Sequence, residues 1–323
     1  MPASIRRSVR ERLRRTVIGA VATLPLAAGA VLLAAPGAAA AGTTIAGVLG
    51  AAGPGNSVGG FAVLGLGGAS TAGVVLTCGN ATVNGNVGVG GPGQFNILPP
   101  CTAKGNLYVA STVTIVGNGG VTGSTITDDA LISQAVSDAQ SASSTFAGMT
   151  ATNTSVTSVN GGSTTFTATQ SGINVVDLAG LSGSPRLTFS CGSFPGCQWV
   201  VNDAGAFQFG SGTVTLGSGL TSGDVLFNVY SHGASISFNP PASVSGIFLA
   251  PYSNWQTKGA WNGELIGGLD GMITVMSGTT INAPPPVTEV PISNPAGAMI
   301  AVLLIGAGLA VATWRSRRRT RVA

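Results

Sequence analysis

Residues 225–267 contain short runs of alternating apolar residues, with Asn, Gly or Pro close behind each run. The runs cover residues 225–230, 234–238, 245–250 and 261–266. Each run is too short for a helix, and the gaps between runs are too short for the crossover helix of a β-α-β unit. The spacing therefore predicts strands that turn directly on one another.

The middle of the chain shows the same pattern. The chain has 50 glycines, 44% hydrophobic residues and only 7% charged residues, which is typical of many short strands between turns. No strict repeat period is visible, so the residues alone leave a β-sandwich and an irregular β-solenoid open. Further strands are expected at residues 73–78, 81–91, 105–116, 164–169, 172–178, 186–191, 198–202, 206–209 and 213–216.

One helix is predicted to interrupt the strands. Thr127 is the expected N-cap, and Asp128 and Asp129 would lie in the first turn, where the helix dipole favours negative charge. Gly148 is the expected stop. The apolar stripe of this helix is mostly alanine, which predicts close packing against a sheet; it consists of Leu131, Ala135, Ala139, Ala142 and Phe146.

The net charge of +4 comes from the two ends of the chain. Six of the fourteen basic residues lie in the first fifteen positions, and five more follow Trp314. Between them, residues 42–296 carry three basic against nine acidic residues. A body with this negative balance gives no support for nucleic-acid binding.

Residues 1–41 are predicted to be a secretory signal peptide. Arginines in the first fifteen positions form a basic n-region, residues 17–35 are apolar, and Ala39, Ala40 and Ala41 are the small residues expected before a cleavage site. The alternative is an uncleaved anchor helix, because the apolar stretch is longer than usual. The prediction places a secreted body at residues 42–282.

The C-terminal region is predicted to be a membrane anchor in three parts. Residues 283–296 form a Pro-rich spacer, residues 297–314 an uncharged span of about 27 Å at 1.5 Å per residue, and residues 315–323 a basic tail. A basic cluster directly after an apolar helix stays in the cytoplasm, so the body is expected to face outward. The cluster consists of Arg315, Arg317, Arg318, Arg319 and Arg321.

This arrangement resembles the PEP-CTERM and LPXTG-type surface sorting signals. It departs from both, because neither Pro-Glu-Pro nor Leu-Pro-x-Thr-Gly is present, and the nearest stretch is Val-Pro-Ile-Ser-Asn-Pro at residues 290–295. The C-terminal region is therefore compatible with cleavage by a sorting enzyme and equally with a retained anchor.

The four cysteines, Cys78, Cys101, Cys191 and Cys197, all lie in the predicted secreted body. Three pairings are possible, and proximity favours Cys78 with Cys101 and Cys191 with Cys197. A zinc site is the rival interpretation. It is disfavoured because no Cys-x-x-Cys occurs and His232 is the only histidine, so no metal and no cofactor are expected.

The body contains no recognisable catalytic machinery. His232 is expected in a solvated turn, the carboxylates are scattered, and no P-loop, EF-hand loop or Gly-x-Ser-x-Gly elbow occurs. We therefore expect a protein that is not an enzyme.

Two sequence features could contact a partner. Tyr252, Trp255 and Trp261 lie within ten residues and could stack on a sugar or anchor a protein, although we favour a role in covering the end of the β core. The alternating residues Thr165, Thr167 and Thr169 could order water or ice on a flat sheet, but such a row is more often the solvent face of a strand.

Several segments resemble the choice-of-anchor A family of bacterial surface domains. They are Phe-Ala-Val-Leu at 61–64, Asn-Gly-Asn-Val-Gly-Val-Gly-Gly at 84–91, Gln-Trp-Val-Val-Asn at 198–202, Ser-Gly-Ile-Phe-Leu-Ala-Pro at 245–251 and Trp-Asn-Gly-Glu-Leu-Ile-Gly at 261–267. The resemblance covers roughly residues 45–276. It implies an irregular β-solenoid with a helix packed alongside, and no catalytic residues.

The resemblance implies an adhesin-like protein anchored at the cell surface. The body would attach to an extracellular matrix, a glycan or a neighbouring surface. One alternative is ice or crystal-surface binding, as in the related ice-binding-like adhesins, although no long threonine ranks are visible along the sequence. A purely structural envelope component is the other alternative.

Overall fold

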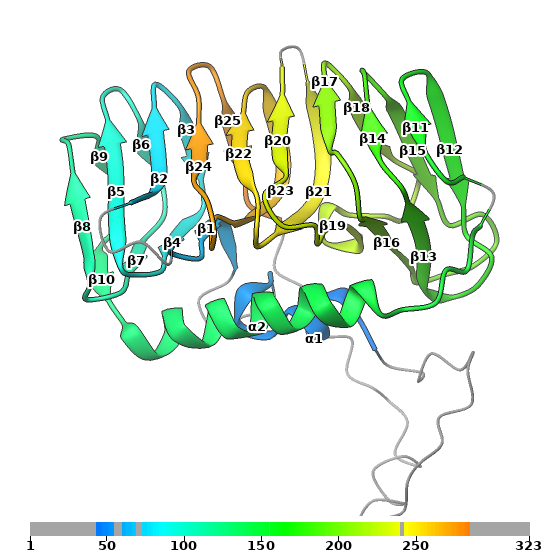
Figure 1. Cartoon of the computed structure of the whole chain (residues 1–323), viewed down its shortest axis with the longest axis horizontal. Coiled ribbons are helices and arrows are strands. Elements are labelled where there is room, and N and C mark those ends of the chain that lie inside the picture. Colours follow the sequence, from blue (N-terminus) through cyan, green and yellow to red (C-terminus); the bar gives the residue numbers. More distant parts are fainter. Residues whose placement is uncertain (1–42, 55–59, 69–72, 155, 240–241, 285–323) are drawn as a thin grey trace, which may run out of the picture. The chain divides into compact units, whose positions relative to one another are not determined.

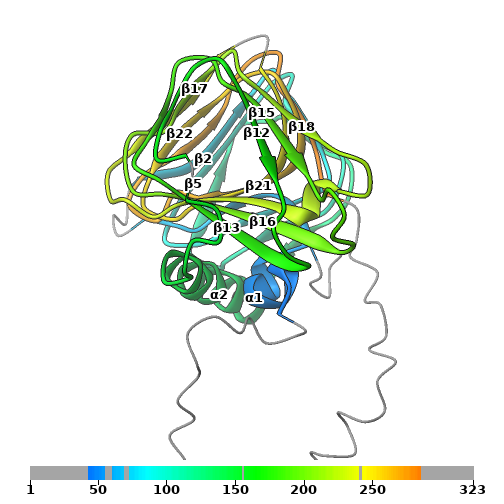
Figure 2. The same cartoon turned by 90° about the vertical axis from the view of Figure 1, so that its right-hand side faces the viewer.

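The computed structural model describes residues 43–54, 60–68, 73–154, 156–239 and 242–284, all within one compact unit. The described residues form a β-solenoid with a long helix alongside (Figure 1). Viewed from one end, three sheet faces enclose a triangular core (Figure 2). All the strand pairs are parallel, which excludes the sandwich and confirms a solenoid of the kind that the resemblance implies.

Each face has nine strands, which are named in order from one end of the solenoid to the other. The helix face, which the helices cover, has β10 (Thr125–Thr127), β7 (Leu107–Val109), β4 (Asn86–Val89), β1 (Phe61–Gly65), β23 (Ala260–Gly267), β21 (Ser243–Ala250), β19 (Val225–Val229), β16 (Cys197–Asp203) and β13 (Gly172–Leu178). The threonine–asparagine face has β9 (Gly120–Val121), β6 (Thr102–Ala103), β3 (Thr82–Asn84), β25 (Thr280–Asn282), the first halves of β23 and β21, β18 (Thr213–Leu216), β15 (Arg186–Ser190) and β12 (Ser163–Thr167). The third face has β8 (Val113–Val116), β5 (Gly93–Leu98), β2 (Val74–Gly79), β24 (Ile273–Val275), β22 (Asn254–Thr257), β20 (Ser235–Phe238), β17 (Gln208–Gly210), β14 (Leu181–Ser182) and β11 (Val159–Asn160).

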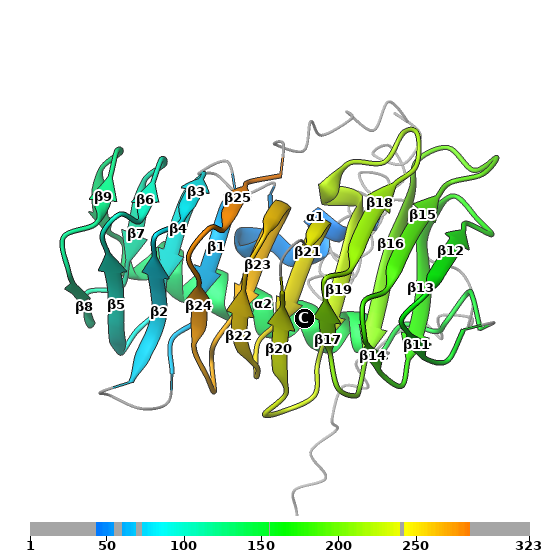
Figure 3. The ribbon, with the colours of Figure 1, turned by 90° about the horizontal axis from the view of Figure 1, so that it is seen from above.

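The coils do not follow one another in chain order. The first coils start in the middle and run to one end, α2 (Asp129–Ala147) returns along the helix face, and the remaining coils run from the far end back to the middle (Figures 1 and 3). The two halves meet where β23, β24 and β25 pair with β1, β2 and β3. The stretch 225–267 therefore lies in the middle of the solenoid.

The predicted helix is present, with one shift at its start. Asp128 is the N-cap, because its side chain accepts a hydrogen bond from the Leu131 backbone N–H, whereas Thr127 is the last residue of β10. Gly148 follows the last turn as predicted. The sequence did not predict α1 (Ile45–Leu49), η1 (Gly50–Ala52) or η2 (Ser222–Asp224), which are one turn each and too short to show a helical period.

Large side chains fill the interior of the triangle. Phe227 of β19 stacks on Phe248 of β21 with ring centroids 4.6 Å apart, and Trp261 of β23 meets Phe248 edge-on at 5.0 Å. These rings belong to one continuous apolar cluster that runs through both halves of the molecule. Aromatic pairs at such distances contribute about 0.5–1.5 kcal/mol beyond the burial of their area.

A second apolar layer lies between the helices and the helix face. The alanine stripe of α2 and Phe146 pack over Val200, Leu226 and Leu249, as the small residues of the stripe predicted. A buried polar network crosses this layer. The Ser143 hydroxyl donates to Asn228 Oδ1 at 2.7 Å, and Asn202 Nδ2 donates to the Phe146 carbonyl at 2.8 Å. The network thus supplies a hydrogen-bond donor to a backbone carbonyl in the last turn of the helix.

Glycines form the edge at which the chain turns from the threonine–asparagine face to the helix face. Gly246 of β21 lies directly beside Gly263 of β23, with φ of 144° and 155°. A Cβ on Gly263 would overlap the Gly246 carbonyl oxygen, and a Cβ on Gly105 would overlap the Gly85 carbonyl. This close approach explains why Asn-Gly or Ser-Gly recurs in successive coils.

Both disulfides favoured by sequence proximity are present. Cys78 in β2 is bonded to Cys101 just before β6, and Cys191 after β15 is bonded to Cys197 at the start of β16. The first bridge therefore joins consecutive coils of the solenoid, and the second joins consecutive strands. By restricting the unfolded chain, bridges over such loops contribute on the order of 2–3 kcal/mol each.

Two carboxyl groups are buried. Burial raises the pKa of Asp203 to about 6, against a hydrogen bond from the Gly205 N–H that favours the charged form. Burial raises the pKa of Glu264 well above its usual value, and the nearby Phe61 backbone, which favours the charged form, offsets only part of this rise. Burial in β23 therefore favours the neutral form of Glu264.

The described residues include no helix long and apolar enough to cross a membrane. The predicted signal peptide at 1–41, the span at 297–314 and the basic tail at 315–323 lie outside the described residues, as does nearly all of the spacer at 283–296.

We expect Gly263→Ala to lower the free energy of unfolding by at least about 2 kcal/mol, because the new methyl group would overlap the backbone of β21. Denaturant unfolding measures the change. Gly79→Ala is the control, since Gly79 has an ordinary φ and open space around its Cα, and it should change the stability little. Equal effects of the two substitutions would contradict the close approach.

We expect the wild-type free energy of unfolding to fall as the pH rises above about 4. The folded protein holds the Asp203 and Glu264 protons to higher pH than the unfolded chain does, so each group lowers stability by up to about 1.4 kcal/mol per pH unit. Asp203→Asn should remove a part of the slope between about pH 4 and 6, and Glu264→Gln should make the profile less steep as well. Denaturant unfolding across pH 4–8 is the measurement, and parallel profiles for wild type and Glu264→Gln would contradict the assignment.

Candidate binding surface

A row of mostly small side chains crosses all nine strands of the threonine–asparagine face. The strand register aligns one residue from each strand, in the order Ser163, Arg186, Thr213, Ser243, Ala260, Thr280, Thr82, Thr102 and Gly120. Six of the nine are serine or threonine. Because neighbouring strands lie about 4.8 Å apart, the hydroxyl groups of the row lie at multiples of this spacing, with interruptions at Arg186 and Ala260.

A second row lies two residues further along the strands. Thr165, Thr188 and Thr215 are aligned in one half, and Ser245, Asn262, Asn282 and Asn84 are aligned in the other. The three asparagines form a ladder. Asn84 Nδ2 donates to Asn282 Oδ1 at 2.7 Å, and Asn282 Nδ2 donates to Asn262 Oδ1 at 2.8 Å. These hydrogen bonds hold the amides in fixed orientations.

Strand alternation fixes which side chains reach this surface. In β12, Phe166 points into the core and is 1% exposed, whereas its neighbours Thr165 and Thr167 are exposed. Trp261 in β23 is likewise buried between Ala260 and Asn262. The period of two therefore sorts large apolar residues inward and small polar residues outward.

The surface is almost free of charge. Among the outward-facing positions in the strands of this face, Arg186 is the only charged residue. Lys104 follows directly after β6. The strand pairs of this face keep their register without a bulge. The third face also presents polar side chains, but its register shifts at β17 and at β2. The threonine–asparagine face is thus the more regular of the two uncovered faces.

The alternating threonines found in the sequence lie on this face. Thr165 and Thr167 are exposed in β12, and Thr169 lies beyond the strand end. The sequence shows these residues along one strand only. The rows that cross the strands join residues from distant parts of the chain, so only the register reveals them.

The structure corrects the aromatic cluster as a contact surface. Trp255 and Trp261 are each 1% exposed, because β22 and β23 turn both rings into the core, where they pack near Phe238. The stretch 252–261 contains the strand β22, which continues the stack of the third face. The two tryptophans belong to the core, as we favoured, but they lie inside it on middle strands and do not cover its end, and Tyr252 remains partly exposed.

Tyr252 stacks on His232, with ring centroids 3.9 Å apart. His232 Nδ1 lies 3.3 Å from Asp270 Oδ2, and both side chains are largely exposed. His232 lies in the turn before β20, as predicted. The described part of the chain contains no group of three or more His, Cys, Asp or Glu that could hold a metal ion.

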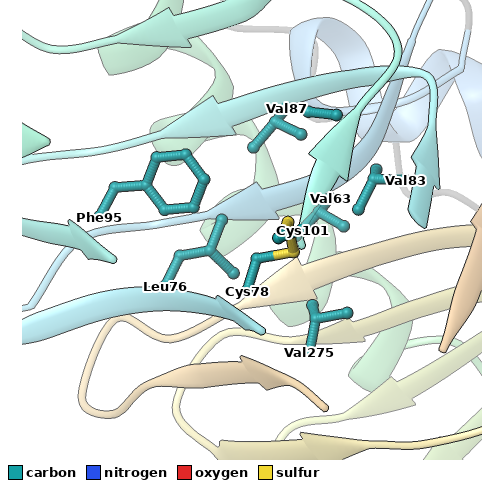
Figure 4. A pocket seen from close by; sticks show the side chains of 9 residues that line it. Val63, Leu76, Cys78, Val83, Val87, Phe95, Cys101 and Val275 are labelled. Atoms are coloured by element: carbon teal, nitrogen blue, oxygen red, sulfur yellow. A yellow bond between two sulfur atoms is a disulfide. The ribbon is translucent and has the colours of Figure 1, made fainter. Parts of the chain in front are cut away.

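The hollows in the described residues are of two kinds. A cavity of about 10 Å³ lies beside the Cys78–Cys101 disulfide and has an entirely apolar lining (Figure 4). It offers no polar partner and is therefore unsuited to hold water. An open groove of about 820 Å³ runs beside α2, lined in part by Ile132, Val136 and Leu269. At its edge, the Ser111 backbone N–H donates to Asp129 and lowers its pKa.

Comparisons with solved structures find several ice-binding proteins. One from the Antarctic ascomycete Antarctomyces psychrotrophicus is 22% identical, covers 72% of this chain and 96% of its own, and has a TM-score of 0.47. A glycosylated one from an Arctic yeast is 18% identical, with 76% and 96% covered and a TM-score of 0.45. One from Shewanella frigidimarina is 15% identical, with 69% and 94% covered and a TM-score of 0.42.

A search of curated proteins finds no significant match. A family model for the ice-binding-like adhesive domain matches residues 35–269 of the 323. The matched region contains α2 and strands from both halves of the solenoid, including the seam between β1 and β23. Since it covers well over half of the sequence, the chain belongs to the family of ice-binding-like adhesive domains.

Proposed function

We propose that this protein is a surface adhesin that attaches to an extended polar surface, such as a glycan or matrix, through its threonine–asparagine face. The observation that carries the proposal is the row across nine strands in register, in which six of the nine residues are serine or threonine. A flat array of this kind matches a partner that itself repeats, because each added rung contributes a further weak contact.

The composition of the face supports this choice of partner. The outward positions offer hydroxyl and amide groups, which both donate and accept hydrogen bonds, and nearly no charge. Such groups suit neutral hydroxylated surfaces. The asparagine ladder is already ordered by its own hydrogen bonds, which lowers the entropy lost on binding.

Ice or another crystal surface is the second candidate. The threonine ranks that are not visible along the sequence are formed across the strands by Thr165, Thr188 and Thr215. Membership of an ice-binding-like adhesive family fits both candidates. They differ in whether the bound surface is ice or a hydroxylated polymer.

The wider context of the protein is also part of the proposal. We propose export by the signal peptide at 1–41, a body at 42–282, and anchoring through the spacer at 283–296, the span at 297–314 and the arginines that follow it. The outward-facing body would belong to the choice-of-anchor A type and would not be an enzyme. Two disulfides support an oxidising, exported environment.

We expect Thr215→Lys to weaken binding to the partner surface by roughly tenfold, because a long charged side chain would hold a flat partner away from the face. Thr215 is exposed in β18. The matched control is Gln256→Lys on the exposed side of β22 in the third face. Glycan and matrix arrays with the purified protein measure both variants.

The same pair of variants separates the two candidate surfaces. Thermal hysteresis and ice-crystal shaping that Thr215→Lys abolishes would favour ice, whereas array binding without any effect on ice would favour the adhesin. If Gln256→Lys weakens binding and Thr215→Lys does not, the third face is the binding face. Unchanged binding by both variants would rule out the two uncovered sheet faces.

We expect deletion of residues 297–323 to release the protein from the cell into the medium, because the apolar span is removed. Fractionation followed by immunoblotting measures the release. Replacing the five arginines after Trp314 by glutamine, with the span intact, is the comparison and should preserve membrane attachment. Retention of the deleted protein on the cell would refute the proposed anchor.

A further inference from the structure

One end of the solenoid is open. The strands β8, β9 and β10, which we call the open end, each pair on one side only, with β5, β6 and β7 respectively. No other described strand continues the stack beyond them (Figures 1 and 3). A row of unpaired backbone N–H and C=O groups on three sides is a template for pairing with another chain.

Exposed aliphatic side chains gather at this end. Leu98 is 45% exposed, and Ile115 and Val116 are 40% exposed each, which makes three of the four exposed large hydrophobic residues in the described part of the chain. Ile115 occupies a core position, because its register partner Phe95 on β5 is 1% exposed. Its exposure shows that the interior of the solenoid lacks a cover at this end.

The opposite end has such a cover. There the core residue Phe166 of β12 is only 1% exposed. The Thr152 backbone N–H donates to the Val175 carbonyl of β13 at 2.9 Å, and the Thr152 hydroxyl accepts from the Val175 N–H at 2.8 Å. Val156 packs against the core from the same segment. A head-to-tail stack of copies would have to displace this segment.

We propose that the open end is an interface between two copies of this chain, related by a two-fold axis that places β8 antiparallel to β8 of the partner. An axis through Thr114 sets the two Thr114 residues opposite each other and sets Val113 opposite Ile115 of the partner subunit. Residues opposite in an antiparallel pair point to the same side, so both apolar residues face the shared core.

The charge distribution favours a second copy as the occupant. Residues 105–127, which form the last coil, contain no charged side chain, and the nearest carboxylates, Asp128 and Asp129, are held by the start of α2 and by the Ser111 N–H. The described residues as a whole carry three basic against eight acidic residues, which disfavours contact between copies elsewhere. A second open end also supplies unpaired strands at the matching spacing and an apolar centre.

This interface is independent of the proposed attachment through the threonine–asparagine face, which stays uncovered in such a pair. Two copies joined end to end would present two binding faces. The same contact could join copies on one cell or on facing cells. The interaction would then add contact between copies to attachment at a foreign surface.

The test uses the purified full chain carrying Thr114→Cys. All four native cysteines are paired, so the new thiol is the only free one. Thr114 is exposed on the outer side of β8, so the substitution leaves the core packing unchanged. Under mild oxidation we expect a disulfide-linked dimer to form roughly tenfold faster than for the control Thr215→Cys, because the interface raises the effective thiol concentration.

A second variant tests the interface without disulfide cross-linking. In light scattering over about 1–100 μM, wild type should change from monomer to dimer, and Ile115→Lys should stay monomeric because its ammonium would face the shared core at the contact. Binding of Ile115→Lys to glycan or ice surfaces should persist per molecule. Equal cross-linking of Thr114→Cys and Thr215→Cys, open-ended oligomers, or a monomer at all concentrations would each overturn the proposal.

Discussion

The parallel pairing of β23, β24 and β25 with β1, β2 and β3 holds the two halves of the solenoid together. Residues near 63 lie beside residues near 265, so this seam forms only when almost the whole chain is in place. Without it, the first three coils would expose a sheet edge and the final coils would lack a neighbour on one side. The continuous aromatic and aliphatic core also passes through the seam, which makes the folding of both halves interdependent.

Two local constraints determine which side chains the joined halves expose and how regularly these side chains are arranged. The alternation of inward and outward side chains removes Phe166 and Trp261 from the surface and leaves threonine and asparagine there. The glycines at the edge, such as Gly246 and Gly263, let adjacent coils turn together at the same point and so keep the strands in register. Helices α1 and α2 cover one of the three faces with apolar contacts. The threonine–asparagine face and the third face remain for partners.

Much of this fold follows from patterns that the sequence shows directly. Short alternating runs identified most of the longer strands, the alanine stripe identified α2, and spacing favoured both disulfides. Errors arose where a local pattern was ambiguous. Thr127 and Asp128 are both good N-caps, and only the pairing of β10 assigns Thr127 to a strand. For Trp255 and Trp261 a contact surface stayed open beside the favoured core role, because proximity in sequence does not show on which side of a strand a ring lies.

The sequence by itself determined the all-β class, the helix that interrupts it, the paired cysteines and the scarcity of charge, because each depends on residues close together in the chain. Tertiary structure alone decided the order of the coils, the rows of Thr213, Ser243 and Thr280, and the exposure of Ile115 at one end. These features depend on which distant strands become neighbours and in what register. That choice is made by the packing of the whole core, to which every coil contributes, and no short stretch of sequence contains it.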